Sequence, residues 1–122
     1  MLKANFYLYS SNASAWDGFH FSSARGTISN TVQTFSAPAL NTWHMVAVTV
    51  SAAAGITYYL NGSSVGTGTV SAFAATNTYD IKLGRDDNYA KCQLGPVLFY
   101  NSVLSGTDIT NVYNHFQPTY RP

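Results

Sequence analysis

Two runs of sequence decide the fold: Trp43-His44-Met45-Val46-Ala47-Val48-Thr49-Val50 and, after a short break, Gly55-Ile56-Thr57-Tyr58-Tyr59-Leu60-Asn61-Gly62. Side chains alternate between the two faces of a strand, and the first run is largely apolar at both parities. This pattern predicts a central strand that is covered on both faces. The second run ends at Asn61-Gly62, the pair most typical of a tight hairpin turn because both positions accept positive φ. A return strand is expected to begin at Val65.

Shorter runs with strand character lie on either side of this hairpin. The sequence predicts strands at residues 4–9, 18–21, 31–35, 79–84 and 93–100. The segments between them are rich in Ser, Asn, Gly and Ala, which favours turns. No internal repeat or linker-like stretch interrupts this order, so the pattern indicates a single β domain.

One helix is predicted near the C-terminus, over residues 105–116. An apolar stripe at helical spacing is formed by Ile109, Val112, Tyr113 and Phe116. Ser105 is a suitable N-cap, and Asp108 three residues later fits a capping box. Pro118 is expected to end the helix and to leave residues 118–122 as a tail.

Composition excludes several classes of function. The chain has 122 residues, enough for one domain with one core. Charged residues make up 9% of it and the net charge is +1, so neither nucleic acid nor an anionic membrane is an expected partner. We expect no transmembrane segment and no signal peptide. Cys92 is alone, which excludes an internal disulfide and a cysteine-based metal site.

Four blocks carry a family resemblance: Trp43-His44-x-Val46-Ala47-Val48-Thr49, Tyr59-Leu60-Asn61-Gly62-x-x-Val65-Gly66, Ile81-x-Leu83-Gly84-Arg85 and Leu94-Gly95-Pro96-Val97-Leu98-Phe99-Tyr100-Asn101. In this order they resemble laminin G-like, concanavalin A-like domains over roughly residues 41–117. The resemblance implies an all-β, antiparallel two-sheet jelly-roll sandwich with one short C-terminal helix, occupying residues 1–117. The ending, with Leu104-Ser105 after Tyr100-Asn101, is most similar to modules of bacteriophage tail and virion proteins.

The chain places fewer strands before Trp43 than the family usually does. Missing strands would leave open sheet edges and exposed apolar faces. Either another chain covers these edges, as a further copy or a neighbouring virion subunit, or the sandwich is smaller than in the family.

The acidic residues argue against catalysis. Glycosidases of this fold use a closely spaced Glu-x-Asp-x-Glu motif, because one carboxyl group donates a proton while the other attacks or activates water. This chain has no glutamate, and no two of its aspartates are spaced i, i+2 on a strand. We therefore expect a protein without enzymatic activity.

Calcium is the candidate ion, although no cofactor is required. Many laminin G-like domains hold calcium with loop oxygen atoms, which suit this cation. Asp86, Asp87 and Asn88 form the densest oxygen cluster, and Asp17 is a second candidate. Other expected ligands are replaced by Ala90-Lys91-Cys92 and Gly95-Pro96. The alternative is a solvated turn in which Asp87 pairs with Arg85 or Lys82.

Two aromatic residues in polar loops are candidates for glycan binding. Trp16 and Tyr89, with Asn88 beside the latter, could offer a ring face and an amide to a sugar. For Trp16 a contact between subunits is the alternative, whereas Trp43 is expected in the core.

These features together predict a non-enzymatic bacteriophage virion protein, a decoration or tail- and fibre-associated subunit that works by protein–protein assembly and by adhesion to surface glycans. The alternative is a lectin-like module that binds carbohydrate or a host receptor. The expected partners are further copies, neighbouring virion subunits and a cell-surface glycan. The expected location is the virion, which is extracellular after release.

Overall fold

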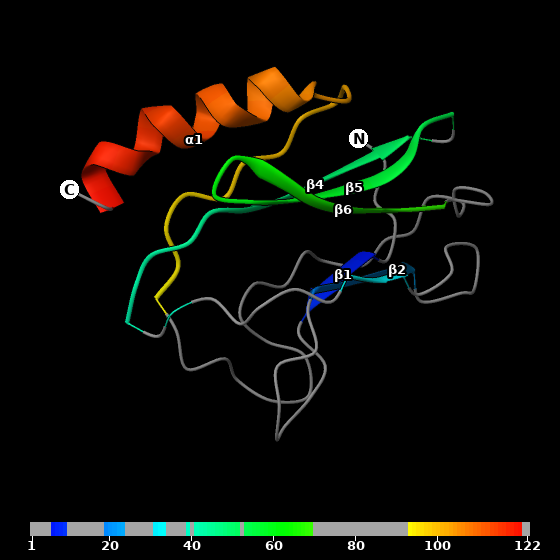
Figure 1. The fold of residues 1–122 in the computed structure, drawn as a ribbon, viewed down its shortest axis with the longest axis horizontal. Coiled ribbons are helices and arrows are strands. Elements are labelled where there is room, and N and C mark those ends of the chain that lie inside the picture. The colour runs from blue at the N-terminus through cyan, green and yellow to red at the C-terminus, as the bar shows by residue number, and fades with distance from the viewer. Residues whose placement is uncertain are drawn as a thin grey trace.

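The computed structural model describes residues 6–9, 19–23, 31–33, 39, 41–51, 53–69 and 93–120. Its elements are β1 (Phe6–Tyr9), β2 (Phe19–Ser23), β3 (Thr31–Gln33), β4 (Val46–Ser51), β5 (Gly55–Leu60), β6 (Ser63–Gly68) and α1 (Gly106–Tyr120) (Figure 1). The predicted strand at residues 79–84 lies outside the described part of the chain.

The described strands form two antiparallel sheets. One has the order β1-β2-β3 and the other the order β4-β5-β6. Figure 1 shows α1 on one side of the β4–β6 sheet and the β1–β2 pair on the other side. Strand β3 contacts β6, and α1 contacts β6 as well. The β4–β6 sheet therefore has neighbours on both sides, a helix on one and the β1–β2 pair on the other.

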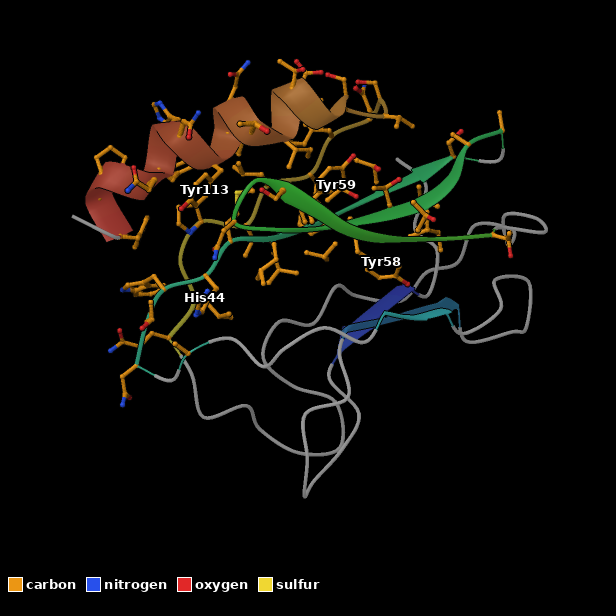
Figure 2. The ribbon with its side chains drawn as sticks, viewed as in Figure 1. His44, Tyr58, Tyr59 and Tyr113 are labelled. Atoms are coloured by element: carbon orange, nitrogen blue, oxygen red, sulfur yellow. The ribbon has the colours of Figure 1, made fainter. Side chains whose placement is uncertain are left out.

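The core sits on β5. Ile56 and Tyr58 are fully buried, and half-buried Val48, Val50 and Val65 pack against them. Tyr59 has the opposite parity and is also buried, and Figure 2 shows its side chain on the side of α1, with Tyr58 on the other side of the sheet. Alternation along one strand thus supplies side chains to two layers of packing.

The central strand differs from the prediction. The run from Trp43 to Val50 was expected to be the central, doubly covered strand. In the structure it pairs only from Val46 onward, lies at the end of the β4-β5-β6 order and is half-buried throughout. The central position among the described strands belongs to β5, because both of its neighbours in sequence pair with it.

The predicted turn at Asn61-Gly62 is confirmed. The φ angles of Asn61 and Gly62 are 50° and 80°, as a two-residue turn between β5 and β6 requires. Strand β6 begins at Ser63, two residues earlier than expected. A β-bulge follows, since Tyr58 pairs with Gly66 while Tyr59 pairs with Ser64, so Val65 is the extra residue. The bulge allows Val65 to pack against the β5 core.

The predicted helix and its capping box are confirmed. The Ser105 hydroxyl accepts a hydrogen bond of 3.2 Å from the Asp108 backbone N–H, and the Asp108 carboxylate accepts bonds of 2.9 Å and 2.7 Å from the Ser105 backbone and hydroxyl. The expected end at Pro118 is wrong, because α1 continues to Tyr120. A proline in the last turn removes only one backbone bond. No helix in the described ranges is long and apolar enough to cross a membrane.

The strand predicted over residues 93–100 is not a strand in the structure. This segment belongs to no sheet, and no backbone hydrogen bond joins it to another described residue. The segment was predicted as a strand of the domain, yet its large apolar side chains are mostly exposed. Within the described residues, the structure therefore departs from the expected strand order directly before α1.

Candidate binding surface

The segment from Gln93 to Ser105 runs back along α1. A Cβ atom built on Gly95 would lie 3.5 Å from the Tyr120 ring, at the end of α1, whereas Ser105 caps the start of α1. A helix of 15 residues is about 22 Å long. Residues 95–105 therefore span the length of α1 in the opposite direction, as the yellow-to-orange trace in Figure 1 shows.

This segment carries a row of exposed apolar side chains, which we call the apolar segment (residues 94–103). Between 42% and 62% of the surface of each large member is exposed. Those members are Leu94, Val97, Leu98, Phe99, Tyr100 and Val103. Single exposed apolar residues are ordinary, but a contiguous row of this kind marks a binding surface or an aggregation hazard.

The chemistry of the apolar segment is that of binding and not of catalysis. It contains no acid, no base, no histidine and no cysteine. Its sequence has the β-branched and aromatic residues of a strand, but its backbone donors and acceptors are not paired with any described residue. An extended backbone with exposed apolar side chains can bury apolar area against another surface or accept a further strand.

An aromatic pair holds the far end of this surface in place. The rings of Trp43 and Tyr120 have centroids 4.9 Å apart and are tilted by 58°. This geometry is favourable for two aromatic rings, and it fastens the last turn of α1 to the chain just before β4. Trp43 was expected in the core, but in the structure it is half-buried. Because Gly95 lies against the same Tyr120 ring, the pair also positions the start of the apolar segment.

His44, next to Trp43, belongs to a hydrogen-bonded network. Its Nε2 lies 3.1 Å from the carbonyl oxygen of Ala39, and its Nδ1 lies 3.2 Å from the Asn61 Nδ2. The carbonyl oxygen can only accept, so Nε2 carries the proton and Nδ1 accepts from Asn61. The Asn61 Oδ1 in turn accepts from the Met45 backbone N–H at 3.1 Å. Both ring nitrogens are engaged, which makes His44 a structural residue of the turn between β5 and β6 (Figure 2).

The site residues predicted from sequence lie outside the described residues. They are Trp16, Asp17, Asp86, Asp87, Asn88 and Tyr89. Within the described ranges no group of three or more His, Cys, Asp or Glu side chains could hold a metal ion. The apolar segment was missed as a surface because its pattern was interpreted as a strand of the domain. Its signal was the same pattern, apolar at both parities, in a stretch without charge.

Comparison with known proteins identifies the family. A family model of the laminin G type, described as the concanavalin A-like lectin/glucanases superfamily, matches residues 3–110. No curated protein and no solved structure matches the chain. The family match spans most of the sequence and includes all the described strands and the start of α1. The chain therefore belongs to the concanavalin A-like lectin/glucanases superfamily.

Proposed function

We propose that this chain is a non-enzymatic subunit of a bacteriophage particle, a decoration or tail- and fibre-associated protein that works by protein–protein contact. The observation that carries the proposal is the apolar segment, with its row of exposed large side chains on a backbone to which no described residue is hydrogen-bonded. In this proposal the β1–β3 and β4–β6 sheets are the two layers of a jelly-roll sandwich, and the apolar segment is covered by a neighbouring protein in the particle.

The composition supports assembly with neutral surfaces. With charged residues at 9%, the chain has few charged groups that would be desolvated when it packs against another protein. An exposed apolar surface of this size on a free protein also promotes association. The bacteriophage assignment comes from the ending of the sequence, Tyr100-Asn101 followed by Leu104-Ser105, which is similar to modules of tail and virion proteins.

The absence of glutamate supports a protein without hydrolase activity. Glycoside hydrolysis in this superfamily needs two carboxyl groups that act together on one bond. Of the five aspartates, the one in the described residues, Asp108, is engaged in the capping box of α1. The sequence thus lacks the closely spaced Glu-x-Asp-x-Glu acids that glycosidases of this fold use.

The test is the presence of the chain in assembled particles. Particles purified from cells that produce this protein should contain the wild-type chain at a fixed ratio to the major capsid or tail proteins. Phe99→Asp places a charge in the apolar segment and should remove the chain from particles. Thr119→Asp, at an exposed position of α1, is the matched control and should be retained. Absence of the wild-type chain, or retention of the Phe99→Asp variant, would contradict the proposal.

Glycan binding is the second candidate function, and membership of a superfamily that includes lectins favours it. In this version Trp16, Tyr89 and Asn88 bind the sugar, while Asp86 and Asp87 hold a calcium ion, with Asp17 as a further ligand. A bacterial glycan array read with calcium and again with a chelator tests it. Binding that disappears with Trp16→Ala and Tyr89→Ala would support this function, and no binding under either condition would exclude it.

A further inference from the structure

We infer that the apolar segment pairs with the same segment of a second copy of this chain, as two antiparallel strands related by a twofold axis. This inference rests on the proposed function in one respect, that the chain acts by protein–protein contact. It adds the identity of the partner and the residues that meet.

The backbone of the apolar segment is suited to pairing over a defined range. No described residue bonds to its N–H and C=O groups, and an extended backbone of this kind can accept a further strand. Pro96 has no N–H, which ends a ladder on that side. Ser105 is committed to the cap of α1, which ends it on the other side. Pairing is therefore confined to residues 97–104.

Within this range, an axis through Tyr100 pairs like residues at the centre and at the two ends. Val97 of one copy then lies opposite Val103 of the other, and Tyr100 lies opposite its own equivalent. The remaining pairs are Leu98 with Ser102 and Phe99 with Asn101. None brings like charges together, and β-branched and aromatic pairs stabilise antiparallel strands. A twofold interface uses the same surface of both partners, so the matched Val and Tyr pairs at its ends and centre fit this symmetry.

The charge and the area of the surface both fit a second copy. Residues 93–107 contain no charged side chain, so they cannot form ion pairs with a strongly acidic or basic partner. Two copies of this segment carry no charges that would repel one another. Half-exposed aromatic and aliphatic side chains of this number offer on the order of 500 Å² per copy. Two copies would bury on the order of 1,000 Å², the lower bound for a specific interface.

Light scattering after size exclusion tests the pairing. At about 100 µM, above the micromolar Kd that a small interface gives, the wild-type chain should have twice the mass of one chain. Phe99→Asp and, as a second variant, Leu98→Lys should each halve the mass because a charge would be buried without a partner. Thr119→Asp should keep the dimer mass. Circular dichroism of each variant establishes that it is folded.

Cross-linking tests the register. Residues that face each other in an antiparallel pair are separated by about 4.5–5.5 Å between Cα atoms, which suits a disulfide. In a Cys92→Ser background, Tyr100→Cys should form a disulfide-linked dimer under mild oxidation, whereas His115→Cys, exposed on α1, should not. A Tyr100→Cys variant that links no faster than His115→Cys would overturn this register.

The outcomes separate this inference from the proposed function. A wild-type monomer at about 100 µM, a concentration chosen for a micromolar Kd, or a dimer that both charged variants leave intact, would overturn the pairing. If such a monomer is still found in particles, the proposed function stands with a different protein as partner. A dimer that is absent from particles would support the pairing and remove the bacteriophage function.

Discussion

The hydroxyl group of Thr110 donates a hydrogen bond of 2.9 Å to the carbonyl oxygen of Gly62 and so joins α1 to the β5–β6 turn. The same hydroxyl lies 3.0 Å from the carbonyl oxygen of Gly106, one turn earlier in the helix. The Tyr113 side chain covers Gly62 in the same contact (Figure 2). One turn of α1 is therefore fitted to one two-residue turn of the sheet.

Replacing Thr110 with valine should loosen this contact. Thr110→Val keeps the shape of the side chain but removes the donor, which leaves the Gly62 carbonyl without its partner. We expect the free energy of unfolding to fall by about 1 kcal/mol, the usual contribution of such a bond. Urea unfolding measures this, with Thr107→Val at an exposed position of α1 as the control. Equal losses in the two variants would show that helix propensity, and not the bond to Gly62, is responsible.

Two glycines should respond to alanine with opposite signs. Gly62 has a φ of +80°, and an added Cβ would lie 3.0 Å from Tyr113, so Gly62→Ala should cost about 1–2 kcal/mol. At Gly106 the nearest atom, the Tyr59 hydroxyl, is 3.9 Å from the added Cβ, and alanine favours the helix. Gly106→Ala should therefore raise the free energy of unfolding, by up to about 1 kcal/mol. Thermal unfolding of both variants provides the comparison, and a gain in stability for Gly62→Ala would contradict the geometry.

The capping box should make stability depend on pH in the acidic range. The bond from the Ser105 hydroxyl, and then that from the Ser105 backbone, lowers the pKa of Asp108 below its ordinary value of 3.8. The charged form is thus favoured in the folded state. The charged Asp108 therefore stabilises the folded chain at pH values above the pKa that Asp108 has in the unfolded chain. This stabilisation is lost as the pH falls through the lower pKa that Asp108 has in the folded chain.

The variant Asp108→Asn tests this dependence. The difference in unfolding free energy between the wild type and this variant should be constant at neutral pH and shrink as the pH falls below about 4. Ser105→Ala should cost about 1 kcal/mol, as the loss of an N-cap does. An NMR titration that places the Asp108 pKa above 3.8 would contradict the bonding described here.

The network around His44 predicts a ring tautomer and a pattern of variants. The ¹⁵N shifts of the His44 ring should show a proton on Nε2, because Ala39 offers only an acceptor. Asn61→Ala should be more destabilising than Asn61→Gly, since both remove the amide but only glycine tolerates the positive φ of this position. Equal losses would indicate that backbone strain contributes nothing there, and an Nδ1–H tautomer would contradict the assigned network.

Local signals in the sequence were sufficient for the turn and the helix start. Asn61-Gly62 encodes its conformation within two residues, and Ser105 with Asp108 encodes a cap within four. The family blocks were sufficient for the superfamily. Each of these features depends on neighbours in sequence or on a pattern spread over the whole domain.

The sequence-based predictions were wrong where the structure depends on a partner far away in the sequence. The pattern of residues 93–100 shows strand propensity, but pairing needs an adjacent strand, which no stretch of sequence specifies by itself. Proline usually ends a helix, but α1 continues past Pro118 to Tyr120. The Tyr120 ring there packs against Trp43, a residue far away in the sequence. Trp43 was placed in the core from its apolar run, although its actual neighbour is the end of α1. The predicted glycan and calcium residues stay predictions.

The tight β5–β6 turn also bears on the order in which the chain folds. Strands β4, β5 and β6 follow one another within residues 46–68, so their contacts close only short loops. The bond between Thr110 and Gly62 joins residues 48 apart, so α1 can bind only after a much longer loop closes. During synthesis the three strands leave the ribosome well before α1 exists. We therefore expect the β4–β6 meander to form early and α1 to add to a turn that is already in place.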